Sequence, residues 1–132
     1  MIDWEIEGRE NLIDRPCVIA SNHQGPWESL FLQTLVVPST SVVKKELLLI
    51  PFFGWAVACT KPITVDRAKK FKSLKRVVNK AKLKLRKGFS IILFPEGTRV
   101  RPEKGIQKFG SSCGLISYEN KVPIIPVCHT SG

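Results

Sequence analysis

The sequence predicts an α/β layered fold with a mixed, largely parallel central sheet flanked by helices. Short apolar runs rich in β-branched residues alternate along the chain with helical segments, which is the order that builds such folds. The runs are too short for buried helices and suit strands covered on both faces. With 132 residues, 43% of them hydrophobic, the chain is expected to form one domain.

Five apolar segments are predicted as strands. They are residues 17–21, 40–43, 62–65, 89–94 and 123–127. The run Ile91-Ile92-Leu93-Phe94 within the fourth segment is the strongest strand signal of the chain. Two shorter helices are expected between strands, over 27–35 and 111–119. Pro26 suits the first position of the earlier helix, with Gly25 as a cap.

The longest predicted helix covers residues 68–87. Its apolar residues recur at spacings of 3, 4, 3 and 4 and form one continuous stripe, made of Phe71, Leu74, Val78, Ala81 and Leu85. Gly88 stands where a C-terminal cap belongs. The same helix is strongly basic, because residues 69–87 hold ten Lys or Arg and no acidic residue.

The charge predicts an anionic partner. The chain has 21 Lys and Arg against 11 Asp and Glu, a formal net charge of +10. The run over 69–87 is either a solvated helix face or a contact with an anionic membrane surface, where each cation near the lipid contributes about 1 kcal/mol. No aromatic platform or helix-turn-helix spacing accompanies it, so nucleic acid is the least favoured partner.

The cysteine pattern favours neither a disulfide framework nor a metal site. Four widely spaced cysteines, with no C-x-x-C pair, are expected to be reduced and mostly buried in a cytosolic setting. The residues after Met1 are acidic, unlike a signal peptide. The longest apolar run, residues 47–59, is shorter than the ~20 residues that span a bilayer.

His23 and Glu28 form the first candidate chemical site. Both follow a predicted strand, with His23 in the polar loop and Glu28 in the first turn of the next helix. Open α/β sheets place ligands at this edge. An imidazole can take a proton from a hydroxyl near neutral pH, and a carboxylate can orient it. A loop histidine beside an ordinary first-turn glutamate is the simpler alternative.

The second candidate site is the segment Phe94-Pro95-Glu96-Gly97-Thr98-Arg99, which follows the strongest strand. Pro95 and Gly97 favour a turn that exposes the Gly97 and Thr98 amides. Together with the Arg99 guanidinium, these donors suit an oxyanion such as a phosphate. The alternative is a strand-ending turn with a surface ion pair between Glu96 and Arg99.

A third segment joins cations to an apolar run. Lys44 and Lys45 precede residues 47–55, and Asp66 and Arg67 close the next strand. The apolar run is either part of the core or the wall of a groove for an acyl chain, with Lys44 and Arg67 at a polar mouth.

Taken together, these segments resemble the glycerolipid acyltransferase family, the 1-acylglycerol-3-phosphate acyltransferases. Asn22-His23-x4-Glu28 is similar to the family's N-H-x4-D motif, and the F-P-E-G-T-R motif is matched in full by residues 94–99. Its K-x-E-L and P-x-F-G block is matched within residues 44–54, and its V-P-I-x-P-V strand within 122–127. Val65-Asp66-Arg67 is similar to its I-D-R-type element.

The resemblance implies a reaction and a set of roles. His23, held by Glu28, would deprotonate the hydroxyl of a lysophospholipid, which attacks the thioester of acyl-CoA or acyl-carrier protein. The acceptor's phosphate and glycerol would be held by Lys44, Arg67, Glu96, Gly97, Thr98 and Arg99. No metal, cofactor or acyl-serine is expected, and the chain would act at the cytoplasmic face of a membrane.

The chain also departs from the family pattern. Glu28 stands where an aspartate is usual, and Val100 where a serine often follows the arginine. The N-terminal membrane helices and the C-terminal part of the family are not matched, so a fragment is expected. Glycerol-3-phosphate is an alternative acceptor, and a non-catalytic module that binds anionic membranes is the rival function.

Overall fold

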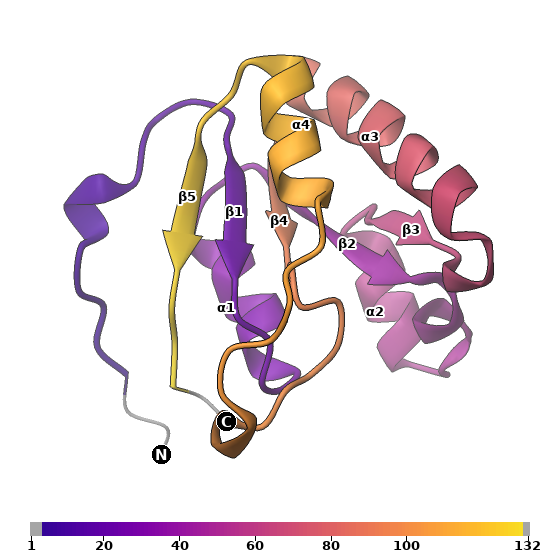
Figure 1. Cartoon of the computed structure of the whole chain (residues 1–132), viewed down its shortest axis with the longest axis horizontal. Coiled ribbons are helices and arrows are strands. Elements are labelled where there is room, and N and C mark those ends of the chain that lie inside the picture. The colour runs from indigo at the N-terminus through magenta and orange to yellow at the C-terminus, as the bar shows by residue number, and fades with distance from the viewer. Residues whose placement is uncertain (1–3, 131–132) are drawn as a thin grey trace.

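The computed structural model describes residues 4–130, apart from the side chains of Arg67 and Lys70, and places its strands in one sheet (Figure 1). In chain order the strands are β1 (Val18–Ser21), β2 (Ser39–Lys44), β3 (Ile63–Val65), β4 (Ser90–Leu93) and β5 (Ile124–Val127). Every pairing is parallel, and the order across the sheet is β3-β2-β4-β1-β5. The predicted α/β layered fold is confirmed, with a wholly parallel sheet among the described strands.

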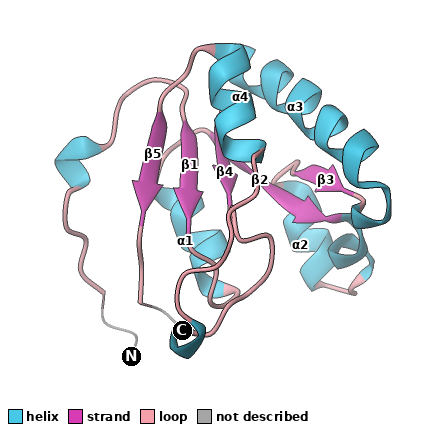
Figure 2. Ribbon diagram, in the orientation of Figure 1, coloured by secondary structure: helices cyan, strands magenta, loops and turns pink. Residues whose placement is uncertain are grey.

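Helices cover both faces of the sheet (Figure 2). The α-helices are α1 (Trp27–Leu35), α2 (Phe53–Cys59), α3 (Lys70–Arg86) and α4 (Ser112–Asn120). Short 3₁₀ helices are η1 (Arg9–Asn11), η2 (Lys45–Leu49), η3 (Arg67–Lys69) and η4 (Pro102–Lys104). Figure 1 shows α3 and α4 on one face and α1 and α2 on the other. No helix within residues 4–130 combines the length and apolar character that a bilayer span requires.

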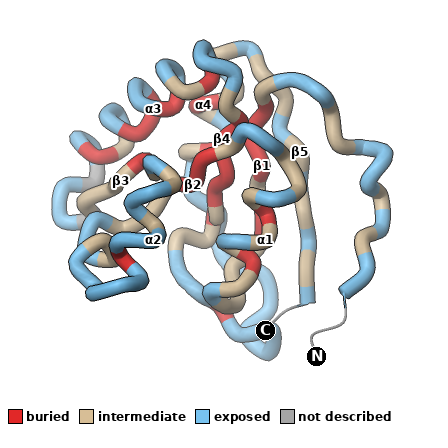
Figure 3. Tube along the Cα trace, turned by 180° about the vertical axis from the view of Figure 1, so that it is seen from behind, coloured by how far each residue is buried: buried red, intermediate tan, exposed pale blue. Residues whose placement is uncertain are grey.

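The core consists of two layers, one on each face of the central strands β1 and β4 (Figure 3). Successive strand side chains point to opposite faces. Val18 and Ile91 therefore pack with α3 and α4, whereas Ile19 and Ile92 pack with Leu32 of α1. Burying each such side chain stabilises the fold by about 1.5–3 kcal/mol. Burial on both faces explains why these strands are apolar apart from the buried Ser21 and Ser90.

The long helix α3 buries a different stripe from the predicted one at its first turn. Val78, Ala81 and Leu85 are in the core as predicted, but Phe71 is 92% exposed. Ser73, in the same turn, is buried instead, and its hydroxyl donates a hydrogen bond to the Asp66 carbonyl. The buried face at this end of α3 therefore passes through Ser73 and Val77, and the prediction for Phe71 was wrong.

Most element boundaries agree with the sequence predictions, and the differences are local. Each strand begins and ends within one residue of its predicted bounds. Pro26 is the N-cap of α1 rather than its first residue, and Gly25 is not the cap. Helix α2 was not predicted. Cys17 and Cys113 are buried, but Cys59 and Cys128 are exposed, so the expectation of mostly buried cysteines was wrong for half of them.

Candidate active site

The parallel sheet brings the two predicted chemical segments to one edge. His23 lies in the loop after β1, and residues 94–99 follow the adjacent strand β4. Their contact is direct, because the Val100 amide donates a hydrogen bond to the His23 carbonyl at 2.8 Å. The His23 ring also stacks on the Phe94 ring, with centroids 4.2 Å apart and planes 21° apart. The described structure thus joins the two segments into one site.

The predicted pairing of His23 with Glu28 is present. His23 Nδ1 lies 2.8 Å from Glu28 Oε1, and the Glu28 side chain is only 1% exposed. A carboxylate oxygen accepts, so Nδ1 carries the proton and Nε2 is left as the basic nitrogen. The His23 side chain is 18% exposed, and Nε2 makes no hydrogen bond within the described residues. The ring is therefore oriented with its basic nitrogen free to meet a substrate.

Glu28 also organises the loop that carries His23. The same oxygen, Oε1, accepts hydrogen bonds from the Gln24 amide at 2.8 Å and the Gly25 amide at 2.7 Å. These amides precede α1 and lie where a capping side chain would ordinarily act. One carboxylate thus closes the turn between β1 and α1 and holds the imidazole.

The surroundings of the pair keep His23 neutral and Glu28 ionised. Burial lowers the His23 pKa below its ordinary value of 6.5, and the positive charge of Arg99 lowers it further, against the raising effects of Glu28 and Glu96. Burial alone would raise the Glu28 pKa, but hydrogen bonds from the Gly25 amide, its own amide, His23 and the Gln24 amide lower it overall. At neutral pH, His23 is therefore a base and Glu28 its anionic support.

Glu96 has a buried carboxylate oxygen with an unmet hydrogen-bonding capacity. Its Oε2 atom is buried and has no hydrogen-bond partner within the described residues. Glu96 follows two residues after Phe94, whose ring stacks on His23, and the charges of Glu96 and Arg99 both act on the His23 pKa. A buried, unpaired carboxylate oxygen is costly, and a hydroxyl group of a bound molecule would satisfy it.

The turn of residues 94–99 offers fewer free donors than predicted. The Gly97 amide donates to the Phe94 carbonyl at 2.9 Å, so the prediction that this amide is exposed for an anion was wrong. Gly97 has a φ of 69°, in the left-handed region that favours glycine. Its role is to close the turn. The Thr98 amide has no partner among the described residues, and the Thr98 and Arg99 side chains are exposed.

Comparison with known proteins places this site in a family. Residues 3–130 match the sequence model of the acyltransferase family, which is almost the whole chain. The chain belongs to the acyltransferase family. The match spans both segments at the edge of the sheet, so the family assignment and the geometry concern the same residues.

Curated relatives of this acyltransferase chain share one name. The 1-acyl-sn-glycerol-3-phosphate acyltransferase of Pseudomonas aeruginosa is 40% identical over 99% of this chain and 51% of its own length. The enzyme of that name from Escherichia coli is 36% identical over 84% of this chain and 45% of its own length. The one from Saccharomyces cerevisiae is 30% identical over 96% of this chain and 42% of its own length. The chain thus spans about half the length of these relatives.

A solved structure has the same fold as this acyltransferase chain. The crystal structure of the 1-acyl-sn-glycerophosphate acyltransferase from Thermotoga maritima superposes with a TM-score of 0.70 at 30% identity. The superposition covers 91% of this chain and 47% of that one. The resemblance to the glycerolipid acyltransferases is therefore confirmed in both sequence and fold.

Two predicted ligand residues are less tightly linked to the acyltransferase site. Lys44 is the half-buried last residue of β2, at the same edge of the sheet, and no hydrogen bond or ion pair joins it to His23 among the described residues. Arg67 begins η3, after the neighbouring strand β3, and its side chain lies outside the described part. Strands β2 and β3 both end at the edge where His23 lies.

Sequence reasoning did not find the contact between Asn22 and His129. The Asn22 side-chain amide donates to the His129 carbonyl at 2.9 Å and accepts from the His129 amide at 3.0 Å. A ring nitrogen of His129 lies 2.7 Å from the Asn22 carbonyl oxygen. The two residues are 107 positions apart, and no local pattern signals such a contact.

The apolar run of residues 47–55 is mostly exposed. Leu47 and Leu48 are half-buried, whereas most of the residues that follow are exposed. The alternative that the run is part of the core was therefore wrong for most of its length. The run lies in η2 and α2, beyond the carboxyl end of β2.

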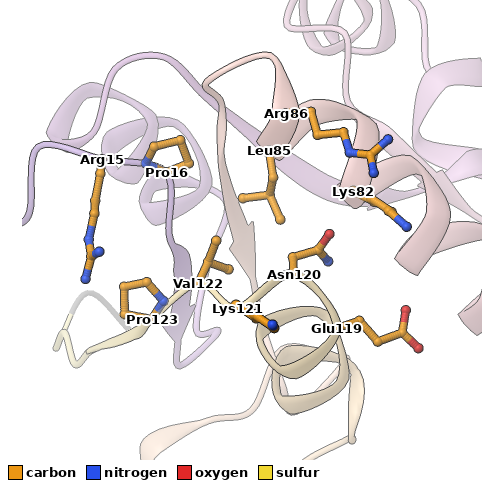
Figure 4. Close-up of a pocket in the computed structure, with 10 residues that line it drawn as sticks. All are labelled: Arg15, Pro16, Lys82, Leu85, Arg86, Glu119, Asn120, Lys121, Val122 and Pro123. Atoms are coloured by element: carbon orange, nitrogen blue, oxygen red, sulfur yellow. The ribbon is translucent and has the colours of Figure 1, made fainter.

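A hollow of about 430 Å³ opens at the opposite edge of the sheet (Figure 4). It lies among the C-terminal ends of α3 and α4 and the residues that precede β1 and β5. Its lining residues are Arg15, Pro16, Lys82, Leu85, Arg86, Glu119, Asn120, Lys121, Val122 and Pro123. None of these was predicted as a site residue, and none touches the His23–Glu28 pair. The hollow is therefore separate from the candidate site at the other edge.

Proposed function

We propose that this chain transfers a fatty acyl group from acyl-CoA or acyl-carrier protein to the free hydroxyl of a 1-acylglycerol-3-phosphate, giving phosphatidic acid. The observation that carries the proposal is the oriented His23–Glu28 pair, with Nε2 free. Glu96, in the neighbouring turn, has a buried Oε2 atom without a hydrogen-bond partner among the described residues. The shared name of the relatives supports the acceptor.

The reaction follows from the tautomer of His23. Nε2 takes the proton of the acceptor hydroxyl as its oxygen attacks the thioester carbonyl carbon. When the tetrahedral intermediate collapses, the C–S bond breaks and the imidazolium returns the proton to the leaving thiolate. Glu28 stabilises the imidazolium through its bond to Nδ1. The products are an ester and a free thiol, and the step balances without a metal or cofactor.

The residues around His23 would hold the acceptor. Glu96 Oε2 would accept a hydrogen bond from a glycerol hydroxyl, which would satisfy its buried oxygen. Arg99 and the Thr98 amide and hydroxyl would bind the phosphate, since a guanidinium matches phosphate oxygens in pairs. Gly97 would act by shaping the turn, and Lys44 and Arg67 would add positive charge from the neighbouring strands.

We also propose that the chain acts at the cytoplasmic face of a membrane with anionic lipids. The basic segment 69–87, which includes all of α3, presents its described Lys and Arg side chains largely to solvent. Cations near such a surface gain about 1 kcal/mol each. No nucleic-acid partner is proposed.

The test is acceptor-dependent thiol release from acyl-CoA on mixed vesicles. Wild-type chain should release thiol when 1-acylglycerol-3-phosphate is present, and His23→Ala should lower the rate by at least about a hundredfold. Arg15→Gln, at the opposite edge, is the control and should leave the rate unchanged. Equal rates for wild type and His23→Ala would contradict the role of His23.

Glycerol-3-phosphate in place of the lysophospholipid tests the acceptor. Faster release with glycerol-3-phosphate would contradict the proposed acceptor while preserving the reaction class. Acyl-carrier protein in place of acyl-CoA then identifies the donor. Vesicle binding with no release from either donor would favour the non-catalytic module.

A further inference from the structure

Five large apolar side chains gather at one exposed projection of the fold, which we call the apolar tip. It consists of Leu49, Ile50, Phe52, Phe53 and Trp55, from the end of η2 to the first turns of α2. Leu49 is 80% exposed, Phe52 78% and Trp55 64%. Exposed apolar residues that occur singly are ordinary, but a contiguous group marks an interaction surface.

The apolar tip is held rigidly in this exposed form. A Cβ atom at Gly54 would lie 2.4 Å from the Leu48 carbonyl oxygen, so only glycine lets α2 approach η2 this closely. Phe52 has a φ of 61°, in the left-handed region that bulky residues rarely adopt. Its ring meets the Trp55 ring edge-on at 5.3 Å. A strained backbone that presents an aromatic ring to solvent indicates a functional constraint.

Positive charges lie next to the apolar tip. Lys44 of β2 pairs with Val65 of β3, so the segments that leave these two residues start side by side. Lys45 opens η2, and Lys69 and Lys72 occupy η3 and the first turn of α3. All three lysines are exposed. The apolar tip therefore projects from a cationic rim, in which these three lysines outnumber the exposed Glu46 of η2 and the half-buried Asp66 before η3.

The apolar tip and the His23 site share the same edge of the sheet. All described strands are parallel, so β1, β2, β3 and β4 deliver their following loops to one side of the molecule. Figure 1 shows α2 and the loop before α1 at this end of the strands. A surface that docks on the apolar tip would therefore face the candidate active site.

We propose that the apolar tip inserts into a bilayer that contains anionic phospholipid. The inference rests on the proposed function, because the acceptor and its product are lipids of that bilayer. Aromatic rings next to lysines form the composition that lies at the level of lipid headgroups. Lys45, Lys69 and Lys72 complement anionic headgroups, while the apolar side chains enter the acyl region. This pose turns the edge of the sheet that carries His23 toward the bilayer.

A second copy of the chain fits this surface less well. A two-fold contact through the apolar tip would place the same cationic rim on both partners. Lys45, Lys69 and Lys72 would then face like charges, which disfavours association. A bilayer with anionic lipid satisfies both the apolar side chains and the lysines.

The experiment measures binding of the chain to phosphatidylcholine vesicles with and without phosphatidylglycerol, by co-sedimentation. Phe52→Gly removes an exposed ring and suits the φ of 61°, so it should fold as well as wild type. Combined with Trp55→Ala, it should lower the partition coefficient by about tenfold or more. The control is Tyr118→Ala, which removes an aromatic ring that is 84% exposed in the last turn of α4. It should leave vesicle binding unchanged.

A charge-matched pair of variants tests the rim. Lys69→Gln with Lys72→Gln should weaken binding to phosphatidylglycerol vesicles by about thirtyfold, since two cations contribute about 1 kcal/mol each at an anionic surface. Lys80→Gln with Lys87→Gln makes the same charge change in the far half of the basic segment and should weaken binding less. Equal effects of the two pairs would contradict a bilayer at the edge where His23 lies.

The remaining outcomes decide the inference without reference to catalysis. Unchanged vesicle binding by Phe52→Gly/Trp55→Ala overturns it. A wild-type dimer in solution that becomes monomeric in that variant assigns the apolar tip to a second copy and also overturns it. No acyl donor is present, so a chain that binds through the apolar tip but transfers no acyl group would leave this inference standing and contradict only the proposed function.

Discussion

Asn22 and His129 join the carboxyl ends of β1 and β5 immediately beside the proposed base. Their hydrogen bonds extend the parallel pairing of the two strands beyond Ser21 and Val127, the last paired residues. The His129 ring contacts the carbonyl oxygen of Asn22 at 2.7 Å, and that carbonyl belongs to the peptide that leads into His23. On the other side, the Val100 amide holds the His23 carbonyl at 2.8 Å. The backbone around His23 is thus hydrogen-bonded to the segments that follow β5 and β4.

His129→Phe should lower kcat with little change in KM for the acceptor. The substitution keeps a ring but removes its hydrogen bond to the Asn22 carbonyl, whose net worth is about 1 kcal/mol, or roughly fivefold in rate if it acts only on the positioning of His23. His129→Gln retains a donor and should recover part of the loss. Steady-state kinetics on vesicles measures both. A lower melting temperature with unchanged kcat would show that His129 is merely structural.

Glu28→Asp should impair the reaction although aspartate is usual at this position in the family. Three donors converge on Oε1 at 2.7–2.8 Å, and they come from His23, Gln24 and Gly25. Shortening the side chain withdraws the carboxylate by about one C–C bond, which stretches all three bonds beyond their usual range. We expect kcat to fall about tenfold and the free energy of unfolding to fall by about 1–3 kcal/mol.

Urea denaturation and vesicle kinetics of Glu28→Asp, compared with Glu28→Gln, separate the two effects. Glu28→Gln keeps the length and removes the charge, so it should damage the rate more than the stability. Full activity in Glu28→Asp would show that the loop adapts to the shorter carboxylate.

Gly54→Ala should destabilise the fold, whereas Gly114→Ala should stabilise it. The new Cβ at residue 54 would overlap the Leu48 carbonyl, and relief requires α2 to move away from η2. Such overpacking typically costs about 1–3 kcal/mol. At Gly114, in helix α4, nothing lies within 4 Å of the added Cβ, and alanine is favoured over glycine by about 0.5–1 kcal/mol within a helix. If the packing of the apolar tip is as described, urea denaturation should show a lower free energy of unfolding for Gly54→Ala and a higher one for Gly114→Ala.

The elements that the sequence predicted well are those whose apolar pattern is unbroken. The strands around Val18 and Ile91 bury both faces, so their composition alone identifies them. Helix α2 was missed because Pro51 and Gly54 interrupt an apolar run that also resembles a strand or a core segment. The stripe on α3 was predicted apart from Phe71, because an apolar repeat does not reveal that the polar Ser73 takes the buried position in the first turn.

The site was predictable where its residues are close in sequence. His23 and Glu28 are five positions apart, so a strand-to-helix turn was enough to pair them. The contact of His129 with Asn22 depends on the order of strands in the sheet, which the sequence does not reveal. The hydrogen bond from the Gly97 amide to the Phe94 carbonyl depends on backbone angles that the sequence motif does not determine.

The pH dependence should shift in opposite directions when the two charges near His23 are removed. The His23 pKa lies below 6.5, so the active, neutral form persists at lower pH than for a free imidazole, and the acid limb of kcat/KM should lie below pH 6.5. Arg99 lowers this pKa, so Arg99→Gln should move the acid limb to higher pH; Glu96 raises it, so Glu96→Gln should move the limb to lower pH. Profiles of kcat/KM against pH measure both, and shifts of the same sign would contradict the described arrangement.

The same groups determine how stability depends on pH. In the unfolded chain His23 binds a proton as the pH falls below 6.5, whereas in the folded chain it does so only near its lower pKa. Between these two pKa values the unfolded chain binds more protons, so stability should decrease as the pH falls. Glu28, whose pKa is lowered from 4.5, should cause a further loss as the pH falls below that value. His23→Ala should abolish the first decrease and retain the second. Urea denaturation at a series of pH values tests this, and a wild-type stability independent of pH between neutrality and 4.5 would contradict the burial of His23 as a neutral base.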